Sequence, residues 1–151
     1  MPGALKDHTL AYSERTFRSG DDKQVVARVD RAYRGRDGLI ALVELKTRQA
    51  ERVYLSDIIE LSAQAVALAG ETGEPVARTA WVVVESAGRR TAHRVTLLKP
   101  RIVWDLAARR EALLAGAASS NYPATSGVCT TCPHRSQCRP GSSTGLPLMR
   151  G

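Results

Sequence analysis

The stretch VARVDRAYRGRDGLIALVELKTR, residues 26–48, has the pattern of a β-hairpin. Residues 24–34 alternate enough to predict one strand. Residues 39–46 are nearly all apolar, which is typical of a strand buried on both faces in the middle of a sheet. The segment between the two runs, residues 34–38, is short and contains glycine, as a hairpin turn requires. We therefore expect two adjacent antiparallel strands.

Three ionisable residues stand out within this hairpin. Asp30 lies in the first run, and Glu44 and Lys46 lie in the second, two positions apart, so that both project from the same face. Folding of the hairpin is expected to bring Asp30 close to Glu44. Burying Glu44 and Lys46 would be costly unless they pair with each other or with a metal ion. Two carboxylates beside a lysine are suited to a hard divalent cation that activates water against a phosphodiester.

A helix is predicted directly after the hairpin, over residues 56–70. Ile58, Leu61 and further apolar residues recur at helical spacing. Ser56 or Asp57 can cap its first turn, and Asp57 with the glutamate three residues later fits a capping box. Glycines follow at the other end, where a helix is expected to stop.

The rest of the chain adds two strands and one more helix to the prediction. Strands are expected over residues 79–86 and 91–98, and a helix over residues 100–114, opened by a proline and ended by a glycine. Residues 1–22 are polar and weakly patterned, which suggests a short helix or an arm. This order of elements predicts an α/β or α+β fold with one central mixed sheet flanked by helices.

Length and charge restrict the class of protein. A chain of 151 residues suits one domain, expected over residues 1–139, with a tail at residues 140–151 that is expected to be disordered. The chain has neither an apolar run long enough to span a membrane nor a secretory signal, so we expect no membrane association and a cytoplasmic location. The formal net charge of +7 favours a polyanionic partner, here DNA.

The acidic residues of the hairpin resemble a known nuclease pattern. Asp30 is followed by a gap of 13 residues and then by Glu44-Leu45-Lys46. This spacing resembles the PD-(D/E)xK nuclease superfamily, and Gln64 in the following helix resembles the glutamine motif of its RecB-like branch. The resemblance implies a restriction-endonuclease-like nuclease core.

The same resemblance implies a mechanism and assigns roles to these residues. It implies hydrolysis dependent on Mg²⁺ or Mn²⁺, with Asp30 and Glu44 as metal ligands and the Leu45 carbonyl as an additional backbone ligand. Lys46 would orient or deprotonate the attacking water, or stabilise the charge that develops on the phosphorane. Gln64 would contact the DNA backbone or hold the geometry of the site.

Two features depart from the RecB-like pattern. Members of this branch usually carry a tyrosine four residues after the helix glutamine, whereas this chain has Leu68. They also usually supply a further histidine or glutamate upstream, for which His8 and Glu14 are the nearby candidates. The first departure concerns the part of the motif that grips DNA rather than the metal site.

The three cysteines of the chain lie within one short segment, residues 129–138. Cys129, Cys132 and Cys138 have the spacing C-x2-C-x5-C, and three thiolates this close can hold one soft metal site. Together with the nuclease pattern, this segment resembles the CRISPR-associated exonuclease family called Cas-four and the AddB-type RecB-like nucleases. Those proteins carry a [4Fe-4S] cluster bound by three C-terminal cysteines and one from an N-terminal segment.

The fourth cysteine of that cluster has no counterpart here, because the chain has none before Cys129 and its N-terminal segment is short, as if reduced. Three alternatives are open. A [4Fe-4S] cluster could form with His134, His93, His8 or an exogenous group as the fourth ligand. Zinc could be bound by the three thiolates and His134. The segment could also be a remnant that holds no metal.

Three hypotheses of function follow from these patterns. The first is a Mg²⁺- or Mn²⁺-dependent deoxyribonuclease, with single-stranded or end-bearing DNA as its substrate. The second is a weak or inactive DNA-binding or adaptor module, and the third is a small zinc-stapled domain whose carboxylates are ordinary surface charges. The resemblance also suggests partner proteins in a CRISPR-adaptation or recombination complex.

Overall fold

The computed structural model describes residues 2–20, 25–118 and 133. By its internal contacts the chain divides into two compact units, residues 1–110 and 111–151. The elements, in chain order, are a 3₁₀ turn η1 (Gly3–Leu5), strands β1 (Thr9–Arg18), β2 (Val26–Arg34) and β3 (Ile40–Thr47), helix α1 (Leu55–Thr72), strands β4 (Thr79–Ser86) and β5 (Arg89–Thr96), and helix α2 (Pro100–Leu114). The prediction of one domain over residues 1–139 stays a prediction.

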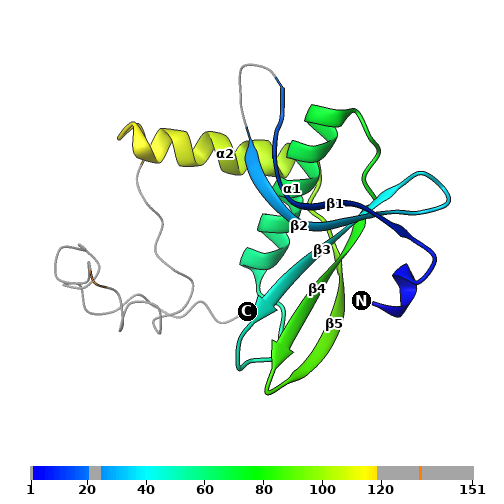
Figure 1. Cartoon of the computed structure of the whole chain (residues 1–151). Coiled ribbons are helices and arrows are strands. Elements are labelled where there is room, and N and C mark those ends of the chain that lie inside the picture. Colours follow the sequence, from blue (N-terminus) through cyan, green and yellow to red (C-terminus); the bar gives the residue numbers. More distant parts are fainter. Residues whose placement is uncertain (1, 21–24, 119–132, 134–151) are drawn as a thin grey trace, which may run out of the picture. The chain divides into compact units, whose positions relative to one another are not determined.

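The five strands form a single mixed sheet in the order β1-β2-β3-β4-β5 (Figure 1). β3 and β4 are parallel, and every other neighbouring pair is antiparallel. The parallel pair requires a crossover, which α1 supplies. The predicted α+β fold with a central mixed sheet and helices is confirmed, and so is the hairpin, whose turn places Gly38 in the left-handed region at φ 78°.

The middle of the sheet is the most buried part of the molecule. β3 lies between two neighbours, and its residues from Ile40 to Glu44 are all buried, as its apolar sequence predicted. On one face, Leu42 and Val82 form a core cluster with Leu61 and other side chains of α1. The central strand and α1 therefore share a core.

The first strand of the sheet, β1, was not predicted. Residues 1–22 suggested a short helix or an arm, whereas residues 9–18 form an edge strand paired with β2. Phe17 is the only residue of β1 that is buried. An edge strand with both faces largely open to solvent has no reason to alternate apolar and polar residues, so its sequence gives little signal.

Helix α1 begins one residue earlier than its predicted range, and its cap differs from the predicted one. Tyr54 is the N-cap residue, and its backbone N–H donates to Asp57 Oδ2 at 2.8 Å. Asp57 is therefore the third residue of the helix rather than its N-cap. The capping box joins Tyr54 and Asp57, not Asp57 and Glu60 as predicted. The helix ends at Gly73, which adopts φ 71°.

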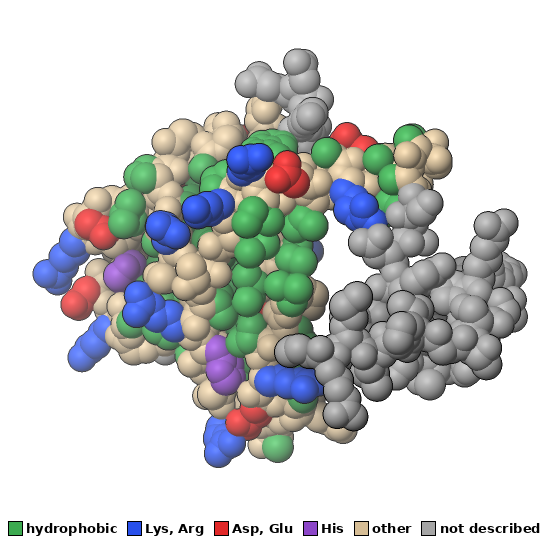
Figure 2. Space-filling view, turned by 180° about the vertical axis from the view of Figure 1, so that it is seen from behind, with side chains coloured by type: hydrophobic (Ala, Val, Ile, Leu, Met, Phe, Trp, Pro, Cys, Tyr) green, Lys and Arg blue, Asp and Glu red, His purple; other side chains and the backbone are tan. Residues whose placement is uncertain are grey.

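Within the described part of the chain, no helix is both long enough and apolar enough to cross a membrane. Figure 2 shows one face of the molecule, on which Lys and Arg side chains lie around a band of hydrophobic ones.

Candidate active site

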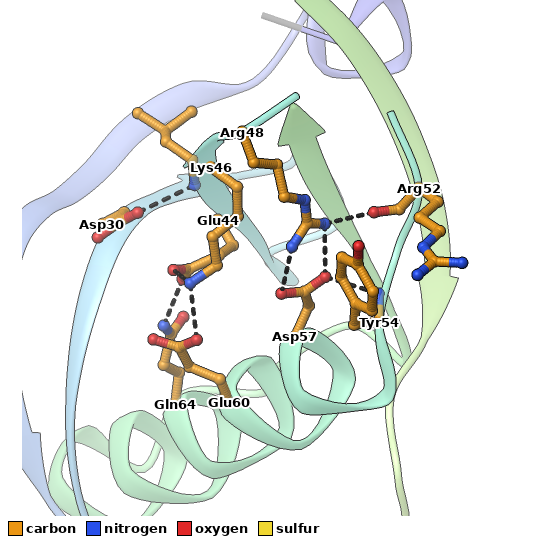
Figure 3. A network of polar contacts seen from close by, with 10 residues as sticks. Asp30, Glu44, Lys46, Arg48, Arg52, Tyr54, Asp57, Glu60 and Gln64 are labelled. Atoms are coloured by element: carbon orange, nitrogen blue, oxygen red, sulfur yellow. Dashed lines mark hydrogen bonds and ion pairs between the residues drawn. The ribbon is translucent and has the colours of Figure 1, made fainter. Parts of the chain in front are cut away.

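Two neighbouring strands bring the predicted acidic residues together. Arg31 of β2 pairs with Val43 of β3, so the next positions along the ladder are Asp30 and Glu44. Asp30 Oδ2 accepts a hydrogen bond of 2.9 Å from the backbone N–H of Leu45 (Figure 3). As the hairpin predicted, Asp30 lies beside the part of β3 that carries Glu44, because it bonds the backbone of the residue that follows Glu44.

Glu44 is held by a partner on each of its two oxygens. Only 3% of the residue is exposed. Lys46 Nζ lies 2.7 Å from its Oε1, and Gln64 Nε2 donates to its Oε2 at 2.6 Å (Figure 3). A carboxylate in such a buried position needs these partners, since an unpaired buried charge is strongly destabilising.

Gln64 reaches the site from α1. The residue is 1% exposed, and its side-chain oxygen Oε1 is buried without a hydrogen-bond partner among the described residues. Buried polar atoms are nearly always paired, and an unpaired one calls for an explanation such as a water molecule or an ion. The Gln64 oxygen therefore marks a polar position inside the site that another group can fill.

Burial and hydrogen bonding act in opposite directions on the pKa of Glu44, and likewise on the pKa of Lys46. Burial raises the pKa of Glu44, which the hydrogen bonds from Lys46 and Gln64 only partly offset. Burial alone would lower the pKa of Lys46, but its hydrogen bonds to Glu44 and Glu60 raise that pKa above its ordinary value. The two carboxylate partners therefore stabilise the ammonium form of Lys46.

Glu60 belongs to the site although the sequence pattern had not singled it out. Its Oε2 lies 2.8 Å from Lys46 Nζ, so one ammonium joins Glu44 and Glu60. Glu60 lies four residues before Gln64, which puts both on one face of α1. That spacing is the signal that could have identified it.

Arg48 is a second residue that sequence reasoning missed. It follows Glu44 and Lys46 at alternate positions, and it makes a bidentate contact with Asp57 at 3.1 and 2.7 Å. Its guanidinium also lies 4.5 Å from the centre of the Tyr54 ring (Figure 3). The contact between Arg48 and Asp57 joins the end of β3 to the first turn of α1, the helix that carries Gln64.

His8 and Glu14 were the candidates for the further upstream residue of the RecB-like pattern. His8 lies away from the site, and Glu14 is paired with another residue. His8 lies against Gly35, in the turn before β3 begins, and so away from Lys46 at the far end of that strand. Glu14 lies in β1 between Ser13 and Arg15, and its carboxylate forms an ion pair with Arg28.

The predictions for the cysteine segment concern residues that the structure does not describe. Cys129, Cys132, Cys138 and the alternative ligand His134 lie outside the described residues. Within the described ranges, no group of three or more His, Cys, Asp or Glu side chains is placed to hold a metal ion. Every prediction about a cluster or zinc at the cysteines stays a prediction.

Asp30 and Glu44 supply carboxylate oxygens, which are the ligands that Mg²⁺ and Mn²⁺ prefer. Mg²⁺ is commonly bound by one or two carboxylates, with water and substrate phosphates completing its shell, so a set of three protein ligands is not required. Asp30 uses Oδ2 for the Leu45 amide, and its Oδ1 makes no hydrogen bond within the described chain. The Leu45 carbonyl remains a predicted backbone ligand.

Comparisons with known proteins bear on the fold. No protein-family model matches the chain, and no curated protein matches it. A solved structure that resembles it is the crystal structure of SSO0001, with a TM-score of 0.55 and 17% sequence identity. The similarity covers 91% of this chain and 60% of SSO0001, so the chain spans less than two thirds of that protein. This likeness supports the fold.

Proposed function

We propose that this protein is a divalent-cation-dependent deoxyribonuclease that hydrolyses phosphodiester bonds in single-stranded or end-bearing DNA. The observation that carries the proposal is the buried Glu44, placed beside Asp30 and bonded to both Lys46 and Gln64. A metal-dependent nuclease of the proposed type uses this combination, in which the acids hold a cation and a separate positive group faces the phosphate. Mg²⁺ or Mn²⁺ held there would supply Lewis-acid activation of water.

Each residue of the site would have its own role in the proposed hydrolysis. Asp30 and Glu44 would hold the cation, and Gln64 would keep the Glu44 carboxylate oriented. The Lys46 ammonium contacts two carboxylates, so it is better suited to stabilising negative charge on the phosphorane than to accepting a proton from water. The positive charge of the chain would draw DNA toward the site.

Cleavage of end-labelled single-stranded DNA in Mn²⁺ tests this proposal. The wild type is compared with Asp30→Asn and Lys46→Met, and Lys99→Met is the matched control because Lys99 is an exposed lysine outside the site. We expect both site variants to cleave at least about 100-fold more slowly, and the control to match the wild type. Equal cleavage by all four proteins would identify a contaminating nuclease and remove the proposal.

A second candidate function is a DNA-binding or adaptor module without useful catalysis. The specific observation in its favour is Leu68, which stands where RecB-like nucleases usually have a tyrosine and is fully buried in the core. No phenol is therefore offered to DNA at that position. Binding of DNA by the wild type without cleavage in either Mg²⁺ or Mn²⁺ would favour this second function.

The metal content of the cysteine segment is tested separately. We propose that Cys129, Cys132 and Cys138 bind a [4Fe-4S] cluster or zinc. Metal analysis and a visible absorption spectrum of protein purified without air distinguish the two, since only the cluster absorbs visible light. Protein with neither iron nor zinc would contradict this part of the proposal.

A further inference from the structure

One ammonium group in the site bridges two carboxylates of different character. Lys46 Nζ lies 2.7 Å from Glu44 Oε1 and 2.8 Å from Glu60 Oε2 (Figure 3). The Glu44 side chain is 4% exposed, whereas that of Glu60 is 49% exposed. Lys46 therefore has one partner inside the site and another at its solvent-facing edge, one helical turn before Gln64 on α1.

A divalent cation and this ammonium would compete for the same carboxylate. Two positive charges on Glu44 repel each other strongly at short range, so the arrival of a cation weakens the contact between Glu44 and Lys46. Lys46 is itself only 25% exposed, and a partly buried ammonium without a carboxylate partner is costly. Glu60 is already within contact distance and can keep the ammonium paired.

We propose that Glu60 is a positioning residue that takes over the Lys46 ammonium when a divalent cation binds at Glu44, and that it thereby sets the cation affinity of the site. This inference rests on the proposed function, because it assumes a cation site at Asp30 and Glu44. Glu60 acts through Lys46 and neither holds the cation nor touches DNA.

Three simpler roles for Glu60 make different predictions. An ordinary surface ion pair would leave cation binding unchanged when Glu60 is removed. A direct ligand, or a purely long-range charge, would affect cation binding whether or not Lys46 is present. A role through Lys46 alone makes the effect of Glu60 depend on Lys46, which a double-mutant cycle measures.

The test is calorimetric titration of the full chain with Mn²⁺ in the absence of DNA. The relevant binding step is defined as the one lost in Asp30→Asn. We expect Glu60→Gln to weaken that step about fivefold, and Glu60→Asp to recover part of the loss. In a Lys46→Met background, Glu60→Gln is expected to change nothing, because no ammonium is left to hold.

The matched control is Glu71→Gln, which removes the same charge from the same helix. Glu71 contacts Arg15 near the other end of α1, and its removal is expected to leave Mn²⁺ binding unchanged. The inference is overturned if Glu60→Gln binds Mn²⁺ like the wild type, or if it weakens binding equally with and without Lys46. A wild type with no binding step that Asp30→Asn abolishes would overturn the metal site itself, and the inference with it.

Discussion

Gln64 donates its amide to a carboxylate that solvent hardly reaches. Glu44 depends on this bond for one of its oxygens, and the pKa of Glu44 is raised by burial even with the bond in place. A hydrogen bond to a buried charged group is worth more than an ordinary one, because its loss leaves the charge poorly solvated. Gln64 therefore stabilises the fold as well as the geometry of the site.

Replacing Gln64 with leucine is expected to destabilise the protein by about 1 to 3 kcal/mol. The physical reason is that Glu44 Oε2 loses its donor while remaining buried. Urea unfolding without divalent cations measures the change. The control is Gln49→Leu, at an exposed position after β3, which is expected to stay within about 0.5 kcal/mol of the wild type. Equal stability of the two variants would show that the Gln64 bond contributes nothing to the fold.

The acidic residues and the lysine were predictable because their spacing reflects strand geometry. Glu44 and Lys46 occupy alternate positions of β3, and the hairpin places Asp30 where it bonds the Leu45 backbone between them. Glu60 was not predicted, although it lies one turn from Gln64, because a glutamate near the start of a helix has an ordinary capping role. Whether Glu60 caps the helix or pairs with Lys46 depends on how β3 packs against α1. The local sequence of the helix does not encode that packing.

The contact of Arg48 with Asp57 fixes how α1 begins. Its two hydrogen bonds join the end of β3 to the first turn of the helix, and only 4% of the Asp57 side chain is exposed. Burial alone would raise the pKa of Asp57, but the hydrogen bonds from Arg48 and from the Tyr54 backbone lower it below its ordinary value of 3.8. The contact holds the helix so that Gln64 can reach Glu44.

This lowered pKa predicts an acid dependence of stability. A carboxyl whose pKa is lower in the folded state contributes stability that is fully present above its unfolded value, near 3.8, and is lost as the pH falls through the lower folded value. We expect Asp57→Asn to be less stable than the wild type at neutral pH and to lose less stability on acidification. Unfolding free energies measured from about pH 6 to about pH 2 test this, and parallel curves would contradict it.

Gly70 allows α1 to pack closely against the end of β1. A Cβ atom on Gly70 would lie 2.9 Å from Ser19 Cα, which is a backbone contact that cannot yield easily. Alanine is otherwise the better helix former by about 1 kcal/mol. We expect Gly70→Ala to destabilise the fold by about 1 to 3 kcal/mol in urea unfolding, contrary to helix propensity. A stabilised variant would show that the helix and strand can separate without cost.

The elements with a clear apolar pattern were predicted well, and the weakly patterned β1 was not. β3 was identified by its apolar run and α1 by its repeating apolar residues, because both contribute to one core. β1 has little buried surface and was missed, although it pairs with β2 along most of its length. Its place at the sheet edge is decided by backbone pairing, which depends only weakly on side-chain type.

Charge acts over the whole molecule rather than at one residue. The net charge is +7, and Lys and Arg side chains are spread over the face shown in Figure 2. Binding of a polyanion to such a surface releases counterions and therefore depends strongly on salt. Positive charge alone supports binding of DNA without distinguishing sequence or strand polarity.

We expect the affinity for single-stranded DNA to fall at least about tenfold between about 50 and about 200 mM salt. Lys46→Met is expected to keep nearly the same salt dependence, because one partly buried ammonium is a small part of the positive surface. Fluorescence anisotropy in EDTA, which prevents cleavage, measures both proteins. A salt-independent affinity would argue against DNA as the polyanionic partner.

The existence of the cation site is tested most directly by X-ray diffraction from crystals grown with Mn²⁺, using the anomalous signal of manganese. We predict a peak in contact with the carboxylates of Asp30 and Glu44, with Lys46 Nζ closer to Glu60 than to Glu44. In crystals of Asp30→Asn the peak is expected to weaken or vanish. A wild-type crystal with Lys46 still bonded to Glu44 and no manganese beside Asp30 would contradict the proposed nuclease.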